Sequence, residues 1–317
     1  MTTLLILLTL PETVRMQYYN GIRARFPDIE IKVVDHHSKV EPYIGDADVL
    51  VTFGPMMAEH VLEKAAKLKW IQALGSGVDG ITDRPALRRD VVVTNLHGIH
   101  GPPVSEAALM AMLALARGLP RTLRNQQQHK WERFPASLLK GKTAAIYGVG
   151  TIAAELAPKC KAFGMRVTGI SSTAREVPGF DRLYPRAELE QAAHEADFFV
   201  LLTPYSAATR GSVGANIFAA MKPTSYLVNL ARGGVVDEDA MIDALRHGRI
   251  AGAALDVFSQ EPLPENHPLW AMDNVIITPH QGGFYDEYVN EALPVIEHNL
   301  RKFLSGDTAG MINLVKR

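Results

Sequence analysis

The fold of this chain is decided by the stretch Ala144-Ala145-Ile146-Tyr147-Gly148-Val149-Gly150-Thr151-Ile152-Ala153. A short apolar run leads directly into the pattern G-x-G-x-x-A. Gly148 permits a tight strand-to-helix turn, Gly150 lets backbone approach a pyrophosphate, and the small Ala153 allows close packing of helix on strand. The helix N-terminus adds free N–H donors and a positive dipole end. Because the pattern follows a strand and opens a helix, it predicts a dinucleotide site.

Short apolar runs alternate with helical patterns almost throughout the chain. The expected strands are Leu4–Leu8, Ile31–Val34, Val49–Val51, Trp70–Ala73, Val91–Val93, Thr143–Tyr147, Arg166–Ile170, Phe198–Leu202, Ser225–Leu230, Ala251–Leu255 and Val275–Ile277. The expected helices are Val14–Arg25, Ala58–Ala66, Val104–Arg117, Arg121–His129, Thr151–Phe163, Ala187–Ala193, Ala215–Ala220, Glu238–Arg246 and Glu287–Leu304. Near-continuous apolar strands alternating with helices predict an α/β fold with two parallel sheets, each covered on both faces.

Composition excludes several kinds of partner. The chain has 33 basic and 34 acidic residues, a formal charge of -1 that gives no electrostatic footprint for nucleic acid or an anionic membrane. The single cysteine, Cys160, cannot form an internal disulfide, which fits a reducing compartment. The apolar N-terminus is short and lacks a basic start, so it predicts a first strand and not a signal peptide. We expect a cytoplasmic protein without nucleic-acid or membrane partners, and no His, Cys and Asp spacing resembles a metal site.

Three isolated segments downstream of the glycine loop each end in one ionisable residue beside Gly or Pro. They are Asn229–Gly234, Asp256–Pro262 and Thr278–Gly283, and they contain Arg232, Glu261 and His280. Taken singly, each residue has an ordinary structural explanation. Arg232 could cap a helix or bind a surface carboxylate, Glu261 could be a turn residue, and His280 could be a loop histidine. Together with a dinucleotide pocket, they are the groups needed to move hydride to or from a carboxylated substrate.

Each of these three residue types has a definite use in that reaction. A 2-oxo acid offers a carboxylate and an adjacent carbonyl, and the planar fork of Arg232 suits both. His280 is expected to protonate the developing alkoxide and to remove the proton in the oxidative direction, because imidazole titrates near neutral pH. Glu261 is expected to hydrogen-bond the other ring nitrogen and so to orient His280.

The end of the second strand of the predicted dinucleotide domain favours NADP over NAD. An acidic residue there binds the ribose hydroxyls of NAD. This chain instead has Ser171, Ser172 and Thr173, with Arg175 close behind. Hydroxyls and a guanidinium can hydrogen-bond a 2′-phosphate, and no carboxylate repels it. The alternative is an ordinary polar loop beside a cofactor site with loose preference.

Further motifs accompany these segments, namely Leu74-Gly75-Ser76-Gly77-Val78-Asp79-Gly80, Val93-Thr94-Asn95, Val104-Ser105-Glu106, Thr203-Pro204 and Thr209-Arg210-Gly211. In this order, and over nearly the whole length, the chain resembles the D-isomer-specific 2-hydroxyacid dehydrogenase family. Glyoxylate/hydroxypyruvate reductases, phosphoglycerate dehydrogenases and D-lactate dehydrogenases belong to that family. The resemblance implies a homodimer built on the central helices and a 2-oxo acid or D-2-hydroxy acid as the small-molecule substrate.

The resemblance also implies a domain plan. A flavodoxin-like substrate domain, residues 1–95 and 286–317, is expected to hold an inserted NAD(P)-binding Rossmann domain, residues 96–285. Backbone N–H groups at Ser76 and Gly77 are expected to bind the substrate carboxylate, together with Arg232 and His280. The expected cofactor contacts are Gly148, Gly150, Thr151, Ile152, Ser171, Ser172, Thr173, Arg175, Thr203, Pro204, Thr209, Leu230, Ala231, Asp256, His280 and Gly282, with Asp256 facing the nicotinamide carboxamide.

Two other functions stay open at this point. One is a dinucleotide-sensing binding protein like the corepressor relatives of the family, although the complete set of ionisable residues argues against lost chemistry. The other is a formate- or phosphite-type dehydrogenase. The formate branch typically has Gln where this chain has Glu261, which counts against it.

Overall fold

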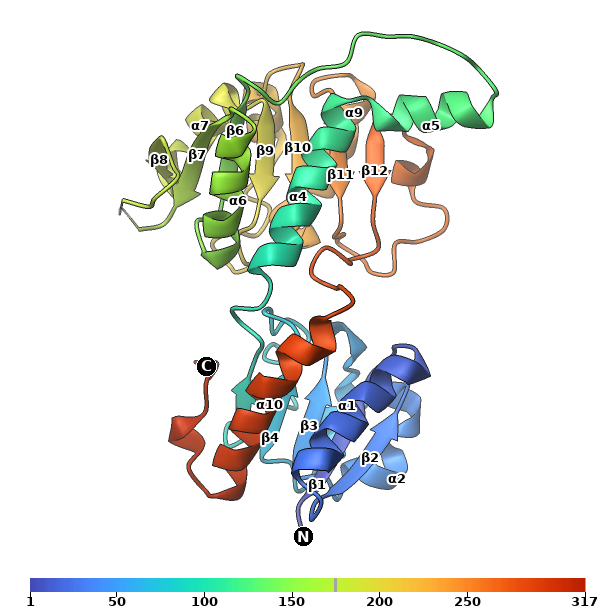
Figure 1. Ribbon diagram of the computed structural model, residues 1–317, viewed down its shortest axis with the longest axis vertical. Coiled ribbons are helices and arrows are strands. Elements are labelled where there is room, and N and C mark those ends of the chain that lie inside the picture. The colour runs from blue at the N-terminus through green and yellow to red at the C-terminus, as the bar shows by residue number, and fades with distance from the viewer. Residues whose placement is uncertain (174–175, 317) are drawn as a thin grey trace. The chain divides into compact units, whose positions relative to one another are not determined.

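The computed structural model describes residues 1–173 and 176–316. The chain forms two compact units, which we call unit 1 (Met1–Ile99 with Tyr285–Arg317) and unit 2 (His100–Phe284). Each unit is built around one parallel sheet, five-stranded in unit 1 and seven-stranded in unit 2 (Figure 1). The prediction of an α/β fold with two parallel sheets is therefore confirmed.

The sheet of unit 1 has the strand order β2-β1-β3-β4-β5. Its strands are β1 (Thr3–Leu7), β2 (Glu30–Val34), β3 (Val49–Thr52), β4 (Trp70–Ala73) and β5 (Val92–Thr94). Its helices are α1 (Glu12–Arg25), α2 (Glu41–Ile44), α3 (Glu59–Glu63) and α10 (Tyr288–Leu304). Every residue of β1, β3 and β4 is buried, as expected where helices cover both faces of a parallel sheet.

A chain of buried polar groups joins α10 to the sheet of unit 1. The indole N–H of Trp70 donates to the Thr94 hydroxyl at 2.8 Å, and that hydroxyl donates to Oε1 of Gln72 at 2.8 Å. The side-chain amide of Asn299, on α10, donates to the same Gln72 oxygen at 3.1 Å. Because buried polar groups are costly unless paired, this chain specifies where α10 packs. The C-terminal helix thus belongs to the same unit as the first strands.

The sheet of unit 2 has the strand order β12-β11-β10-β9-β6-β7-β8. Its strands are β6 (Thr143–Tyr147), β7 (Arg166–Ser171), β8 (Arg182–Pro185), β9 (Phe198–Leu201), β10 (Tyr226–Asn229), β11 (Gly252–Leu255) and β12 (Val275–Ile277). The chain runs outward from β6 through β7 to β8, and then restarts at β9 on the other side of β6. The carboxyl ends of β6 and β9 therefore form the switch point at which such sheets bind ligands.

Helices cover both faces of the unit 2 sheet. They are α4 (Gly101–Ala116), α5 (Leu119–Gln127), α6 (Thr151–Ala162), α7 (Leu189–Glu195), α8 (Ala215–Ala220) and α9 (Glu238–Arg246). The apolar helix α4 packs against α6, β10 and β11, so much of its burial comes from its own unit. After α5 the chain makes a long excursion without helix or strand before it enters β6 (Figure 1).

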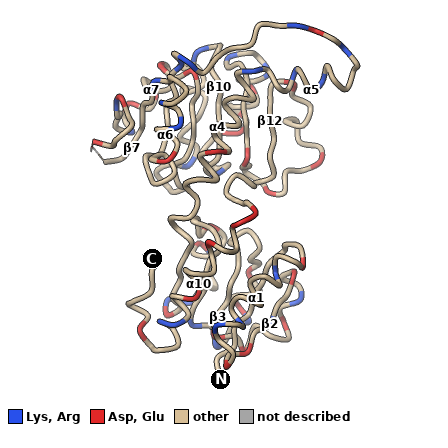
Figure 2. Tube along the Cα trace, in the orientation of Figure 1, with Lys and Arg blue, Asp and Glu red and all other residues tan. Residues whose placement is uncertain are grey.

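Charged residues of both signs are interspersed along each unit (Figure 2). Within the described part of the chain, no helix combines the length and apolar character needed to cross a bilayer.

Candidate active site

The glycine loop between β6 and α6 has the local geometry that a phosphate-binding turn requires. Gly148 has a φ of 106°, and a Cβ atom there would lie 2.5 Å from the backbone nitrogen of Thr203. A Cβ atom on Gly150 would meet nothing within 4 Å. Open space thus lies over Gly150 at the start of the 12-residue helix α6, which begins with Thr151 and Ile152. A pyrophosphate fits this arrangement, since helix N-termini present free N–H donors.

The other predicted cofactor residues lie at the carboxyl ends of neighbouring strands in unit 2. Ser171 ends β7, and its hydroxyl oxygen accepts a hydrogen bond from the backbone N–H of Thr173 at 3.2 Å. Arg175, predicted to contribute to NADP binding, lies outside the described residues. The remaining predicted residues follow β7, β9, β10, β11 and β12, and they are Ser172, Thr203, Pro204, Leu230, Ala231, Asp256, His280 and Gly282.

Thr209 uses its hydroxyl within the chain. The hydroxyl donates to the carbonyl oxygen of Pro204 at 2.7 Å and accepts from the backbone N–H of Ser206 at 2.8 Å. These bonds close the turn that follows β9, and Thr209 is buried. In this structure its role is to shape the loop that carries Thr203 and Pro204.

The three predicted catalytic residues lie on neighbouring loops of unit 2. Nδ1 of His280 lies 2.7 Å from Oε2 of Glu261, and the backbone N–H of Phe258 donates to Oε1 of the same carboxylate at 2.9 Å. The positive charge of Arg232 acts on Glu261 as well. A carboxylate, an imidazole and a guanidinium are therefore brought together where β10, β11 and β12 end.

Glu261 is held as a carboxylate. Burial raises the pKa of its carboxyl group, but the hydrogen bond and charge of His280, the N–H of Phe258 and the charge of Arg232 outweigh burial. The pKa of Glu261 therefore lies below its ordinary value. With Nδ1 of His280 engaged by this carboxylate, Nε2 is the second nitrogen of the ring.

A buried carboxylate fixes the loop that carries His280. Asp256 is 3% exposed, and its Oδ1 accepts from the Thr278 hydroxyl at 2.5 Å and from the Gln281 N–H at 3.0 Å. Its Oδ2 accepts from the Gly282 N–H at 2.9 Å, and its backbone carbonyl accepts from the His280 N–H at 2.8 Å. Asp256 thus holds both flanks of His280, a role that its position in the sequence did not predict.

The backbone of His280 adopts an unusual conformation, with a φ of 50°. Non-glycine residues rarely occupy this left-handed region, and those that do often lie at functional sites. The hydrogen bonds to Asp256 on both sides of His280 supply the restraint that such a conformation needs.

Two glycines bring the loop of Arg232 against neighbouring structure. A Cβ atom on Gly233 would lie 1.9 Å from the carbonyl carbon of Phe258, so only glycine allows the two loops to touch. A Cβ atom on Gly234 would lie 2.7 Å from the ring of Tyr205. The side chain of Asn229 also shapes this turn, since it accepts from the Ala231 N–H at 3.1 Å. The segment Asn229–Gly234 was predicted to belong to the site, but no sequence signal identified Asn229 or Phe258 individually.

Ser76 and Gly77, predicted to bind the substrate carboxylate, lie in unit 1, on the loop after β4. Two side chains of the same unit anchor this loop. The amide of Asn95 donates to the Ser76 carbonyl at 2.7 Å, and the hydroxyl of Tyr288 donates to the Leu74 carbonyl.

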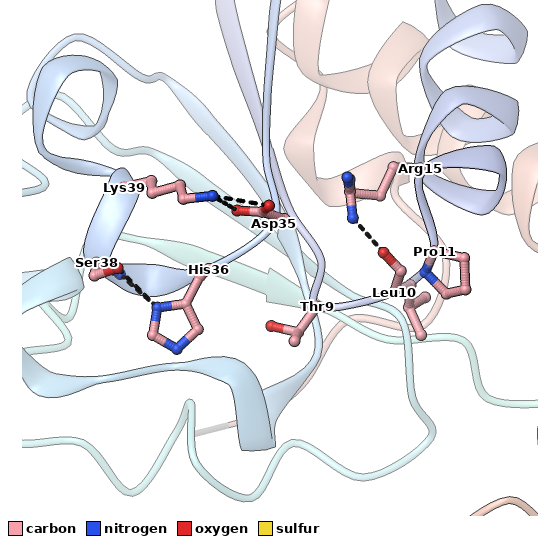
Figure 3. A pocket seen from close by; sticks show the side chains of 8 residues that line it. All are labelled: Thr9, Leu10, Pro11, Arg15, Asp35, His36, Ser38 and Lys39. Atoms are coloured by element: carbon pink, nitrogen blue, oxygen red, sulfur yellow. Dashed lines mark hydrogen bonds and ion pairs between the residues drawn. The ribbon is translucent and has the colours of Figure 1, made fainter.

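Unit 1 also contains a hollow of about 570 Å³ beside the ends of β1 and β2 (Figure 3). Several of its charged and polar groups bind one another or the nearby backbone. Lys39 pairs with Asp35 at 2.8 Å, Nδ1 of His36 lies 2.8 Å from the Ser38 hydroxyl, and Arg15 donates to the Leu10 carbonyl. None of the predicted site residues lines this hollow.

Two further observations limit the chemistry of the described part of the chain. It contains no group of three or more His, Cys, Asp or Glu side chains arranged to hold a metal ion. Cys160 is buried in α6, and burial raises the pKa of its thiol to about 12. A thiol in that state is inert as a nucleophile at neutral pH.

Comparison with known proteins identifies the family. The model of the family described as D-isomer specific 2-hydroxyacid dehydrogenase, NAD binding domain, matches residues 109–282, which lie within unit 2. The chain belongs to the D-isomer-specific 2-hydroxyacid dehydrogenase family. The resemblance predicted from the sequence is therefore confirmed.

Two curated members of this dehydrogenase family illustrate how the chain relates to it. A D-3-phosphoglycerate dehydrogenase of Methanocaldococcus jannaschii is 37% identical over 84% of this chain and 51% of its own length. A glyoxylate reductase of Pyrococcus furiosus is 32% identical over 91% of this chain and 90% of its own length. The chain thus spans about half of the phosphoglycerate dehydrogenase but nearly all of the glyoxylate reductase.

Solved structures of the 2-hydroxyacid dehydrogenase family match both units. A family protein from Aeromonas salmonicida is 35% identical, with a TM-score of 0.88 and 99% of each chain covered. An NADPH-dependent glyoxylate/hydroxypyruvate reductase from Sinorhizobium meliloti, in complex with NADP and sulfate, is 26% identical with a TM-score of 0.84, covering 100% of this chain and 98% of that one. A D-lactate dehydrogenase from Aquifex aeolicus, complexed with NAD and lactic acid, is 25% identical with a TM-score of 0.85, covering 98% of each chain.

Proposed function

We propose that this chain transfers hydride between NADP(H) and a 2-oxo acid or D-2-hydroxy acid, acting mainly as a reductase. The observation that carries the proposal is the contact of 2.7 Å between His280 and Glu261, close enough to Arg232 for its charge to act on the carboxylate. A structural ion pair has no need of a histidine with a φ of 50°. The set matches the needs of ketone reduction: a cation for the substrate, a proton donor, and a group that orients the donor.

In this proposal each residue acts at a stated atom. Arg232 binds the substrate carboxylate and polarises the neighbouring carbonyl through its planar fork. A bound reduced nicotinamide supplies the hydride that reaches the carbonyl carbon. Nε2 of His280 gives its proton to the carbonyl oxygen, so that the ketone becomes a hydroxyl group, and takes the proton back in the reverse direction. Glu261 holds the ring in place through Nδ1 throughout.

The preference for NADP is supported by the residues at the end of β7. Ser171, Ser172 and Thr173 place hydroxyls, and no carboxylate, where an NAD-specific chain has an acid. Family members have been solved with NADP and with NAD, so membership alone leaves the preference open. The cradle of Gly148, Gly150, Thr151 and Ile152 is proposed for the pyrophosphate of either cofactor.

The proposed substrate class is a small 2-oxo acid such as glyoxylate or hydroxypyruvate. A curated glyoxylate reductase and a solved glyoxylate/hydroxypyruvate reductase are among the proteins that the chain resembles, which supports this class. The family resemblance adds the N–H groups of Ser76 and Gly77 as proposed ligands of the substrate carboxylate.

We also propose a homodimer formed by α4, α5 and the segment that follows them. This part of unit 2 exposes large apolar side chains on consecutive elements, and Trp131 is 96% exposed. Exposed apolar clusters of this kind are typical of surfaces that bind another protein. The residues concerned are Met110, Leu119, Leu123, Trp131 and Leu138.

The experiment that tests the activity pairs a substrate panel with one substitution. Purified protein is assayed with NADPH and NADH against glyoxylate, hydroxypyruvate, pyruvate and bulkier 2-oxo acids. His280→Gln should lower kcat by about 10²- to 10⁴-fold while NADPH still binds. Tight dinucleotide binding by the unaltered protein without turnover of any 2-oxo acid would instead indicate a sensing protein, and near-normal turnover by His280→Gln would exclude it as the acid.

A further inference from the structure

The edge strand β8 places a second arginine beside the end of β7. Strands β7 and β8 run parallel, and Pro185 is the register partner of Ser171, the last residue of β7. Neighbouring strands lie about 4.8 Å apart. Arg186 follows Pro185 directly and opens a short 3₁₀ turn, Arg186–Glu188, which packs against β7. The side chain thus originates next to the point where a bound dinucleotide presents its adenosine ribose.

Arg186 has an unsatisfied buried donor. Its Nε atom is buried and has no hydrogen-bond partner among the residues that the structure describes. Buried donors are nearly always paired in folded proteins, and an unpaired one calls for an explanation such as a missing ligand. A guanidinium with a free Nε–H is suited to an acceptor with several oxygens.

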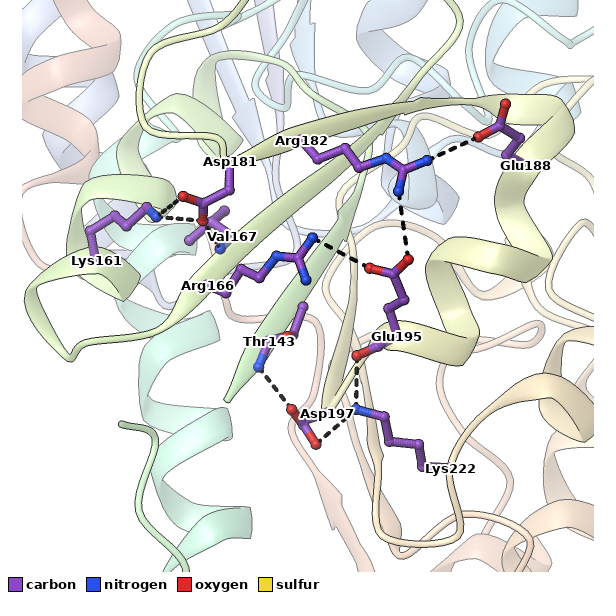
Figure 4. Close-up of polar contacts among 10 residues, drawn as sticks. All are labelled: Thr143, Lys161, Arg166, Val167, Asp181, Arg182, Glu188, Glu195, Asp197 and Lys222. Carbon is purple, nitrogen blue, oxygen red and sulfur yellow. Dashed lines mark hydrogen bonds and ion pairs between the residues drawn. The ribbon is translucent and has the colours of Figure 1, made fainter. Parts of the chain in front are cut away.

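The carboxylates nearest along the chain are engaged elsewhere. Arg182 lies between Glu188 at 3.8 Å and Glu195 at 3.7 Å, and Arg166 also pairs with Glu195 at 3.5 Å (Figure 4). These ion pairs leave Arg186 without a carboxylate partner among the described residues. An anion from outside the chain would supply the missing charge.

The polar groups beside Arg186 select the kind of anion. The end of β7 offers the hydroxyls of Ser171, Ser172 and Thr173, and the backbone N–H of Thr173 turns back onto the Ser171 oxygen at 3.2 Å. Hydroxyl donors together with one guanidinium can hydrogen-bond a phosphate ester, and these residues include no carboxylate that would repel it. We propose that Arg186 binds the adenosine 2′-phosphate of NADP and is a determinant of the preference for NADP over NAD. This inference rests on the proposed dinucleotide function of unit 2.

The test uses adenosine fragments that take no part in hydride transfer. Binding of 2′,5′-ADP and of 5′-AMP to the full chain is measured by isothermal titration calorimetry, followed by NADPH and NADH. Arg186→Met should lower the affinity for 2′,5′-ADP and NADPH by about 10- to 100-fold, as expected for the loss of charge-assisted hydrogen bonds. It should change the affinity for 5′-AMP and NADH by less than about twofold. The affinity of Arg186→Lys for NADPH should lie between those of the wild type and Arg186→Met.

Arg182→Met is the matched control, because it removes an arginine of the same strand that is already paired with Glu188 and Glu195. It should leave the ratio of 2′,5′-ADP to 5′-AMP affinity unchanged. The melting temperature of each variant without ligand shows whether it folds; since the Nε of Arg186 has no partner to lose, Arg186→Met should melt at or above the wild-type temperature.

Equal weakening of the ligands with and without a 2′-phosphate, or no change in either, would overturn the assignment of Arg186. Neither result bears on His280, because the fragments carry no nicotinamide. Conversely, an inactive protein that still binds 2′,5′-ADP in an Arg186-dependent way would overturn the proposed catalysis alone. Failure of the wild-type chain to bind any adenine nucleotide would overturn both.

Discussion

Oε2 of Glu261 lies 2.7 Å from Nδ1 of His280, while Oε1 of the same carboxylate accepts the Phe258 N–H at 2.9 Å. Each oxygen therefore has one donor, and the carboxylate cannot rotate without losing one of them. The imidazole is oriented by a group that is itself fixed to the backbone. This relationship lets the pair be tested through stability as well as through catalysis.

Glu261 should make folding stability depend on pH. Its pKa is lowered in the folded chain, so it stabilises the fold above its unfolded pKa of about 4.3, and this contribution disappears as the pH falls through the lower folded value. Glu261→Gln should therefore be less stable than the wild type at neutral pH, and the difference should shrink as the pH falls below the unfolded pKa of about 4.3. Urea unfolding at a series of pH values measures this difference in the free energy of unfolding. The exposed Glu265→Gln is the control, and a difference for Glu261→Gln that stays constant with pH would contradict the prediction.

Asp256 should act on the reaction through the loop of His280. Asp256→Asn replaces one carboxylate oxygen with an NH₂ group, which cannot accept, so either the Gln281 N–H or the Gly282 N–H loses its acceptor. An unpaired buried donor costs about 1–3 kcal/mol, and we expect a loss of stability of that size. We also expect kcat to fall while KM for NADPH changes little. A large rise in KM with unchanged kcat would instead support the expected contact with the nicotinamide carboxamide. Thr278→Val, which removes only the hydroxyl donor, should have a smaller effect.

Arg232→Lys should separate charge from geometry. Lysine keeps the positive charge but loses the planar fork that binds a carboxylate through two hydrogen bonds. KM for the 2-oxo acid should rise about tenfold or more, as expected for the loss of one charge-assisted hydrogen bond. The Kd for NADPH, measured by fluorescence, should stay within about twofold. If KM is unchanged, Arg232 does not bind the substrate.

The two loop glycines make a matched pair for testing the dinucleotide cradle. Gly150 has an ordinary extended backbone, with a φ of -115°, and open space where a Cβ atom would lie. Gly150→Ala should therefore fold normally and yet bind NADPH more weakly, because the methyl group occupies the space left for the pyrophosphate. Gly148→Ala should unfold at lower temperature, since its φ of 106° and the Thr203 backbone exclude a side chain. Thermal unfolding with and without NADPH distinguishes the two, and full affinity in Gly150→Ala would argue against the cradle.

Apolar composition explains which strands could be predicted from sequence. Three strands were predicted with the bounds that the structure shows, namely Trp70–Ala73, Thr143–Tyr147 and Val275–Ile277. Each is a short, mainly apolar run of the length typical of a strand. The edge strand Arg182–Pro185 was missed. It begins with a charged residue, has only Leu183 and Tyr184 between that residue and a proline, and so differs little in pattern from a loop. Because this strand was not predicted, Arg186, which follows it, was not predicted as a site residue.

Two helices of unit 2 begin earlier than the sequence predicted. The helix expected from Val104 begins at Gly101, and the one expected from Arg121 begins at Leu119. In both, proline occupies the first turn, where its missing N–H costs nothing. At the site, the pairing of Glu261 with His280 followed from residue types and order. The use of Asp256 to hold the loop did not, because it depends on backbone N–H groups that carry no mark in the sequence.

The contact between the loops of Arg232 and Glu261 can be tested with neighbouring glycines. A methyl group on Gly233 would lie 1.9 Å from the backbone carbonyl carbon of Phe258, whose own N–H donates to Glu261. Backbone cannot yield as a side chain can, so Gly233→Ala must push the two loops apart. We expect it to displace Arg232 and Glu261 together and to lower kcat/KM by about 10²-fold or more, the scale on which a misplacement of about 1 Å acts. Gly234→Ala is the control, because its methyl group would meet only the ring of Tyr205, a partly exposed side chain that can rotate away. It should retain most of the activity, and equal losses in the two variants would show that the contact with Phe258 does not position the site.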